Sequence, residues 1–153
     1  MEPLDLTVAP PRSPHESLGG LVMLARTIDK LRAELPGGNR GDYQSIRGLT
    51  ILQLELLGIA RDELLNVVAG AASEDDVVQW VHAHSDELGY AAINERLSRY
   101  TLADNPPERW EFVDTLYPNR PKLPRDQVNV FDMLVQDDRD CFSAKPAPTS
   151  PSR

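Results

Sequence analysis

The chain has 153 residues, of which 41% are hydrophobic and 26% are charged, and its formal net charge is −8. A chain of this length can enclose a hydrophobic core, and a negative charge of this size disfavours nucleic acid and anionic membrane surfaces as partners. Because the sequence has neither an apolar run of about twenty residues nor a basic, apolar leader pattern, we expect a cytoplasmic protein without a membrane span.

The first long helix is predicted over residues 21–35, where apolar side chains recur at intervals of three or four. It ends before Pro36-Gly37-Gly38, a typical stop signal. Upstream, Ser13-Pro14-His15-Glu16 has the cap residue, early proline and glutamate of a short helical turn. Gly19-Gly20 follows, and these two glycines let the chain change direction before the long helix begins.

A second helix is predicted over residues 49–57, and its apolar side chains lie on two sides. Leu52 and Leu56 share one face, whereas Ile51 and Leu54 lie nearly opposite. A helix of this kind is either buried on two sides or forms an interface with a partner.

The remaining helices are indicated by their caps and stops. Residues 61–69 form a short helix between Gly58 and Gly70, and Ser73 with the three acidic residues after it caps another. Three further helices are predicted by the same signals. One runs from the cap Ser85 to Tyr100, and another lies around Val128–Val135. Between them, a helix starts at Asn105-Pro106-Pro107-Glu108 and stops at Pro118, with Trp110, Val113 and Leu116 buried.

These helices together predict an all-α fold. No six-residue stretch alternates without also fitting a helical period, and there is no Asn-Gly or Asp-Gly hairpin signal. We therefore expect an irregular or orthogonal bundle of about seven helices in a single domain over residues 1–142. Residues 143–153 are rich in proline and serine, and they are predicted to form a disordered tail.

Familiar catalytic and metal-binding patterns are absent from the sequence. His82 and His84 are two residues apart on one helix, so they face different directions and cannot share a metal ion. His84 is predicted on an apolar stripe, as a buried core histidine or a ligand contact. Cys141 is the only cysteine, which excludes an intrachain disulfide and a thiolate metal cluster. We expect no catalytic residue, no metal and no cofactor.

Charged residues crowd the first long helix, in the sequence A-R-T-I-D-K-L-R. A helical wheel places Arg32 inside the buried face, and an unpaired buried charge is costly. One interpretation is that Arg32 extends past the helix end or pairs with Asp29. The other is that Arg32 anchors an internal carboxylate or a bound anion, with Arg26 and Lys30 beside it. The glycine-rich stretch that follows, from Pro36 to Tyr43 and on to Gly48, is a long turn or a binding loop.

Several short motifs occur in order along the chain: D-L-T at residues 5–7, P-R-S-P at 11–14, L-G-G at 18–20, L-A-R-T-I-D-K at 24–30, L-G-I at 57–59, S-E-D-D-V-V-Q-W-V at 73–81 and V-F-D-M-L at 130–134. With this ordered set the chain resembles the bacterial family known as domain of unknown function 5069. The resemblance implies a bacterial cytosolic protein with no assigned activity, cofactor or binding residue. The family's polar signature, either a site or a hydrogen-bond network, falls on Asp5, Thr7, Arg12, Ser13, Arg26, Asp29 and Lys30.

We expect a non-catalytic binding protein that holds a small amphiphilic or anionic ligand in a pocket between helices. The alternative is a protein-interaction module or homodimer that uses the helix at residues 49–57. An enzyme is the third hypothesis, with Asp29 and His84 as its acid and base candidates. The candidate ligand-binding residues are Arg12, Arg26, Asp29, Lys30, Arg32, Tyr43 and His84.

Overall fold

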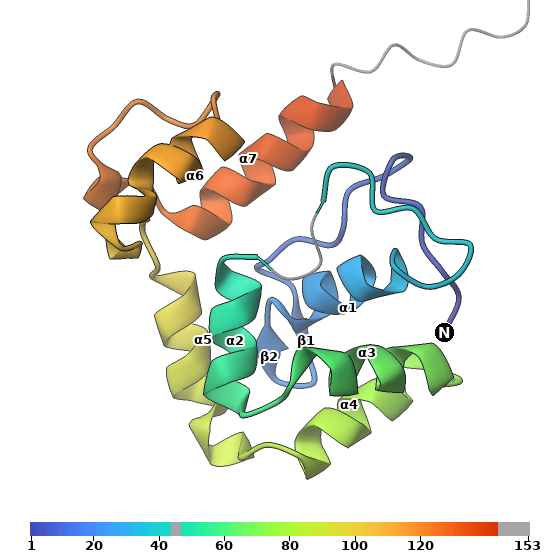
Figure 1. Ribbon diagram of the computed structural model, residues 1–153. Coiled ribbons are helices and arrows are strands. Elements are labelled where there is room, and N and C mark those ends of the chain that lie inside the picture. The colour runs from blue at the N-terminus through green and yellow to red at the C-terminus, as the bar shows by residue number, and fades with distance from the viewer. Residues whose placement is uncertain (44–46, 144–153) are drawn as a thin grey trace, which may run out of the picture. The chain divides into compact units, whose positions relative to one another are not determined.

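The computed structural model describes residues 1–43 and 47–143 (Figure 1). The chain forms two compact units, residues 1–99 and residues 100–153. Within the described residues there are seven α-helices, four short 3-10 helices and one two-stranded hairpin. The predicted all-α fold with about seven helices is therefore confirmed, and the single domain over residues 1–142 stays a prediction. Of the predicted disordered tail, only Ser143 lies among the described residues, and it ends the last helix.

A small β-hairpin precedes the first helix and was missed in the sequence analysis. Strand β1 (Ser17–Leu18) pairs antiparallel with β2 (Leu21–Val22). Gly19 and Gly20 form the turn with φ angles of 59° and 82°, and positive φ at both central positions suits the right-handed twist of a hairpin. Gly-Gly is one of the residue pairs that favour this turn, so the sequence did contain the signal. The segment Ser13–Glu16 forms a turn rather than a helix, with a hydrogen bond from the Glu16 N–H to the Ser13 carbonyl at 3.1 Å.

Helix α1 (Leu24–Arg32) is shorter than predicted at both ends: residues 21 and 22 belong to the hairpin, and the helix ends at Arg32 rather than at residue 35. Met23 joins the two elements and has a φ of 67°, although it is not a glycine and is only 2% exposed. Such a conformation costs about 1–3 kcal/mol and persists only where the surroundings impose it. Here the Met23 N–H donates to the Pro14 carbonyl at 2.9 Å, and its carbonyl accepts from the Thr27 N–H at 3.0 Å. These contacts fix the direction in which α1 leaves the hairpin.

Four more helices complete the first unit. The predicted helix at residues 49–57 is confirmed as α2 (Leu49–Leu57), and Gly58 with a φ of 70° ends it. Helix α3 (Arg61–Gly70) also ends at its predicted glycine. Helix α4 (Glu74–Ala83) begins with the predicted cap, since the Ser73 hydroxyl accepts a hydrogen bond from the Asp76 N–H.

The helices of the first unit pack on elements that are often not their neighbours along the chain. A 3-10 helix η1 (Glu87–Gly89) leads into α5 (Tyr90–Ser98). The residue that caps η1 is Asp86, whereas the sequence predicted Ser85 as the cap of this helical segment. Helix α1 packs on α3, α3 packs on α4, and α5 packs on both α2 and β2 (Figure 1). The completely buried apolar side chains of this unit are Leu21, Leu24, Ala25, Ile28, Leu31, Leu64, Val68, Val77, Val81 and Leu97.

The second unit contains α6 (Trp110–Leu116) and α7 (Val130–Ser143), together with η2 (Leu102–Asp104), η3 (Pro107–Arg109) and η4 (Arg125–Gln127). An isolated antiparallel bridge joins Thr101 to Asn129. The predicted start before Trp110 is confirmed, but the expectation that Trp110, Val113 and Leu116 are buried is wrong, because all three are half-buried. The buried apolar residues of this unit are Leu102, Val128, Val130, Phe131 and Met133. Helix α7 extends eight residues beyond the predicted end at residue 135.

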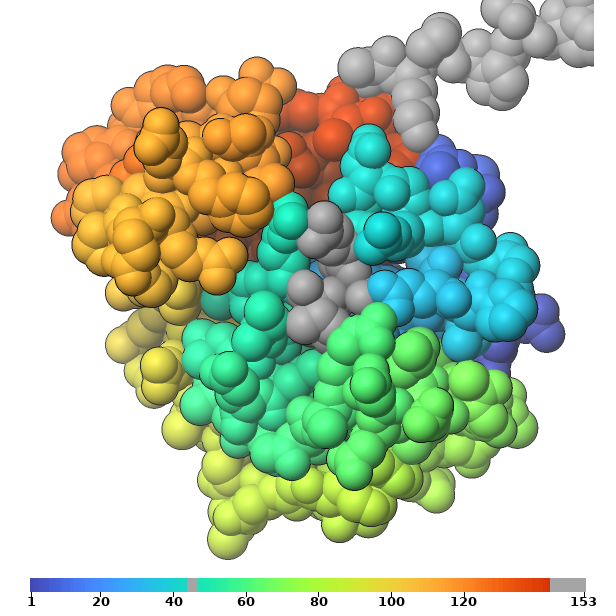
Figure 2. All heavy atoms as spheres, viewed as in Figure 1, coloured from blue at the N-terminus to red at the C-terminus, as the bar shows by residue number. Residues whose placement is uncertain are grey.

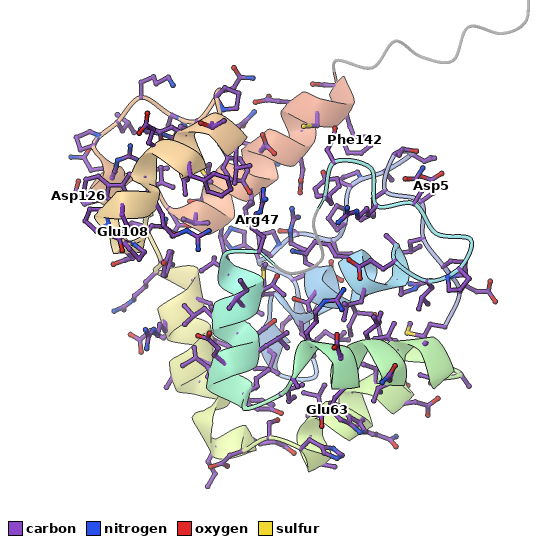
Figure 3. All side chains as sticks on the ribbon, viewed as in Figure 1. Asp5, Arg47, Glu63, Glu108, Asp126 and Phe142 are labelled. Atoms are coloured by element: carbon purple, nitrogen blue, oxygen red, sulfur yellow. The ribbon has the colours of Figure 1, made fainter. Side chains whose placement is uncertain are left out.

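Asp114 connects three parts of the second unit. Its carboxylate accepts from Arg120 Nε at 2.7 Å and from the two terminal nitrogens of Arg125 at 3.1 and 2.7 Å. The guanidinium of Arg125 also lies 4.9 Å from the centre of the Trp110 ring. We name Asp114, Arg120 and Arg125 the Asp114 clasp. Figure 3 labels Glu108 and Asp126, two exposed acidic residues of the same unit.

None of the helices in the described residues is both long enough and apolar enough to cross a lipid bilayer.

Candidate functional site

Helix α1 is enclosed on all sides although half of it is polar. Every residue from Leu24 to Leu31 is buried, including four that can hydrogen-bond or carry charge. These four are Arg26 (3% exposed), Thr27 (0%), Asp29 (4%) and Lys30 (6%). Helix α2 adds two more buried polar side chains, Thr50 and Gln53, both completely buried. We name these six residues the α1–α2 polar cluster, and charged residues of this kind are rarely so buried unless they are paired.

Asp29 is held mainly by one residue from the N-terminal segment, Arg12. One carboxylate oxygen accepts from the Arg12 main-chain N–H at 2.8 Å and from its Nε at 3.0 Å, and the other accepts from Nη2 at 2.9 Å. The Arg12 guanidinium also pairs with Glu74, the first residue of α4. Desolvation on its own would lower the pKa of Arg12, but the hydrogen bonds to Glu74 and Asp29 outweigh it and raise the pKa. Arg12 therefore stays charged at any working pH and connects α1 to α4.

Arg26 points toward the same N-terminal segment. Its Nη1 donates to the main-chain carbonyl of Arg12 at 3.3 Å. Its guanidinium carbon lies 5.7 Å from the centre of the Tyr43 ring, within the range of a cation–π contact. The structure thus brings Arg12, Arg26 and Tyr43 together, as three of the predicted candidates, and Tyr43 belongs to the predicted turn or binding loop.

Lys30 is the second buried cation of α1, and it faces α2. Its Nζ donates to the Thr50 hydroxyl at 3.0 Å. Lys30 lies four residues after Arg26, so the two side chains leave the helix from neighbouring positions, Arg26 toward the N-terminal segment and Lys30 toward α2. Like charges at this spacing repel each other, and burial strengthens the repulsion because little water screens it.

Gln53 links three elements through its amide group. Its oxygen accepts from the Thr27 hydroxyl at 3.2 Å, and its nitrogen donates to the Val22 carbonyl at 2.6 Å. Sequence reasoning missed Thr27, Thr50 and Gln53. The available signal was the polar pair Thr50 and Gln53, three residues apart inside the apolar run L-T-I-L-Q-L-E-L-L, because that spacing puts both on one helix face.

The buried polar groups of the described residues are satisfied. No buried side-chain nitrogen or oxygen among them lacks a hydrogen-bond partner. The polar signature implied by the family resemblance thus falls partly on one connected network, through Arg12, Arg26 and Asp29, while Lys30 pairs with Thr50. Asp5, labelled in Figure 3, is exposed and accepts a hydrogen bond from the Thr7 N–H at 2.9 Å. The remaining signature residue, Ser13, accepts from the His15 N–H at 3.2 Å.

The expectation that Arg32 lies inside the buried face is wrong. Arg32 is half-buried in the last turn of α1, and its Nε donates to the Glu2 carbonyl at 2.7 Å. The expected pairing with Asp29 does not form either, because Arg12 occupies that carboxylate. The helical wheel assumed a helix from residue 21, whereas α1 has nine residues and ends at Arg32 beside the N-terminal segment. This is the interpretation in which the side chain extends past the helix end.

The expectation that His84 lies on a buried stripe is also wrong. His84 is exposed, stacks on Trp80 with 4.1 Å between ring centres, and has its Nδ1 2.8 Å from the Trp80 carbonyl oxygen. It follows the last residue of α4, so the helical pattern no longer governs its direction. In the described parts of the chain, no hydrogen bond joins His84 to Asp29, the other acid/base candidate.

The fold and the cluster define a small, mainly α-helical protein whose first helix is enclosed together with its own charged residues. A family model described as domain of unknown function (DUF5069) matches residues 8–140. The chain belongs to this family, which confirms the resemblance inferred from its motifs. No curated protein matches the chain.

Proposed function

We propose that the protein is a cytoplasmic, non-catalytic binding protein for a small anionic ligand, which it holds at Arg26 and Lys30. One observation carries this proposal: two cations four residues apart on α1 are both more than nine-tenths buried. Removing two like charges from water is costly, and their mutual repulsion adds to that cost. An oxyanion that accepts from both would add to the hydrogen bonds that Arg26 and Lys30 already make with Arg12 and Thr50.

The surrounding groups favour a carboxylate or a phosphate group. The guanidinium of Arg26 offers a planar set of N–H donors, and the ammonium of Lys30 offers a compact charge with three donors. The Thr50 hydroxyl, 3.0 Å from Lys30, is a further group that can turn toward an oxygen atom. The Tyr43 ring beside Arg26 would contact an apolar part of the same ligand, which suits an amphiphile.

The test begins with native mass spectrometry of freshly purified protein, which would reveal a tightly held ligand. Thermal shifts with phosphate and carboxylate compounds are then compared for wild type, Lys30→Met and Arg96→Met. Arg96 is an exposed cation on α5, so its variant matches the change in net charge without touching the polar cluster. We expect the ligand to stabilise wild type and Arg96→Met but not Lys30→Met. Equal responses of all three proteins, or no response from wild type, would contradict the proposal.

A second candidate function is recognition of a protein partner or a second copy through α2. Ile51 on this helix is 39% exposed, and it lines an open depression together with Leu54 and Ile59. Figure 2 shows the adjoining surfaces of α2 and α3 in teal and green. An exposed apolar surface of this kind is a feature of interaction sites. Light scattering over a range of protein concentrations tests the homodimer, which a constant monomer mass would exclude.

A further inference from the structure

We infer that Asp29 is a positioning residue for the proposed anion site, because it holds the guanidinium of Arg26 in place through Arg12. This inference rests on the proposed function and adds to it a residue that carries the wrong charge for an anion site. It depends on three contacts that link Asp29 to Arg12 and on one that links Arg12 to Arg26.

The first step is the attachment of Arg12 to α1. The Asp29 carboxylate binds both the main-chain N–H and the side chain of Arg12, at distances from 2.8 to 3.0 Å. Contacts to both its main chain and its side chain restrict the movement of Arg12. The side chain of Asp29 is only 6% exposed, so water competes weakly for these hydrogen bonds.

The second step is the hydrogen bond from Arg26 of α1 to Arg12 of the N-terminal segment. Because Arg12 is fixed, its carbonyl oxygen has a set direction, and that oxygen accepts from Arg26 Nη1 at 3.3 Å. Arg26 and Asp29 are three residues apart on α1, so the contacts close a ring from the helix to the segment and back. The ring restricts rotation of the Arg26 guanidinium. A binding group that is already ordered loses less conformational entropy when the ligand binds.

The charge of Asp29 and its positioning role predict opposite changes in anion affinity when the carboxylate is removed. A negative carboxylate next to Lys30 opposes the binding of an anion, so electrostatics alone predicts tighter binding in Asp29→Asn. The ring predicts weaker binding, because Arg12 loses part of its attachment and its carbonyl, which accepts from Arg26, loses its fixed direction. Glu74 is the matched control, since it pairs with the Arg12 guanidinium but not with its main-chain N–H. Glu74→Gln makes the same change in charge and leaves the attachment to Asp29 intact.

The experiment uses the full chain as wild type, Asp29→Asn and Glu74→Gln, with inorganic phosphate as the probe at constant ionic strength. Calorimetric titration should show phosphate affinity about tenfold lower in Asp29→Asn, the size expected for one misplaced charge-assisted hydrogen bond. Affinity in Glu74→Gln should stay within about twofold of wild type or rise. Phosphate binding by a folded Asp29→Asn that equals or exceeds wild type would overturn the inference.

A second measurement needs no ligand. The side-chain Nε–H signal of Arg26 in NMR spectra should be sharp and slow to exchange in wild type and Glu74→Gln, and broadened in Asp29→Asn. If wild type does not bind phosphate, the proposed function fails for that probe, and this signal alone decides the inference. If Asp29→Asn does not fold, Arg12→Lys replaces it, because it keeps the charge and loses the fork that binds Asp29. An unchanged Arg26 signal in the folded variant would overturn the inference.

Discussion

Asp29 in the first unit and Asp114 in the second have similar chemistry and different surroundings. Each carboxylate accepts three hydrogen bonds from arginine, with at least two from a guanidinium group. The side chain of Asp29 is 6% exposed, whereas that of Asp114 is 39% exposed. Water therefore reaches the Asp114 carboxylate more readily than that of Asp29, although Arg120 and Arg125 are 11% and 20% exposed and Arg12 is 29% exposed.

The difference between the two carboxylates shows that contact geometry alone does not give an energy. An ion pair at the surface contributes about 0–1 kcal/mol, because both charges are already well solvated when the pair is broken. Breaking a buried pair costs about 3–5 kcal/mol, because the remaining charge cannot regain its water. The buried α1–α2 polar cluster is thus the part of the molecule where a single substitution has the largest consequence.

The largest expected effect comes from removing each carboxylate in turn. Asp29→Asn should lower the free energy of unfolding by about 3 kcal/mol, at the lower end for a buried pair because Arg12 keeps Glu74. Asp114→Asn should lower it by about 1 kcal/mol or less. Urea denaturation of the two variants at neutral pH measures both values. Equal losses would show that burial does not separate the two arrangements.

A smaller effect is expected from the neutral part of the same cluster. Gln53→Leu leaves the Thr27 hydroxyl and the Val22 carbonyl without their partner, and we expect a loss of about 2 kcal/mol. The double variant Thr27→Val with Gln53→Leu should recover part of that loss, since the orphaned hydroxyl is removed as well. The measurement is a double-mutant cycle by urea denaturation. Strict additivity of the two substitutions would contradict coupling through the hydrogen bond.

A substitution in the hairpin before α1 should lower the free energy of unfolding by about 1.5 kcal/mol. This is the size expected when a residue with a side chain is forced into the left-handed region. Gly19 has a φ of 59°, and an added Cβ would lie 2.7 Å from a methyl carbon of Val78. Gly19→Ala should therefore lower the melting temperature. The control is Gly70→Ala, where nothing lies within 4 Å of the added carbon and an alanine should be neutral or slightly stabilising. A harmless Gly19→Ala would argue against the observed turn.

The smallest expected effect is the change with pH in the stability that the Asp114 carboxylate contributes. Hydrogen bonds from Arg125 and then Arg120 hold the pKa of Asp114 well below its usual range. A lowered pKa in the folded state means that the stabilisation is present above the ordinary value, near pH 4, and is lost as the pH falls below it. The difference in unfolding free energy between wild type and Asp114→Asn should shrink by less than about 1 kcal/mol from pH 6 to pH 2.5. A difference that grows on acidification would have the wrong sign.

Local signals predicted most of the helices correctly. The cap at Ser73, the stop at Gly58 and the stop at Gly70 all appear in the structure at their predicted positions. The hairpin was missed because a glycine pair was interpreted only as a change of direction. That error lengthened the first predicted helix, and it placed Arg32 on the wrong face.

The sequence by itself determined where α2 and α3 end and where α4 begins, because caps and stops act through hydrogen bonds within a few residues. It also marked the first long helix as unusually charged. Only the tertiary structure decided which charges are buried, and with what partners. Arg12 meets Asp29 across 17 residues, and Gln53 meets Thr27 across 26. Contacts at such separations depend on how whole segments approach one another, and no local spacing in the sequence records that approach.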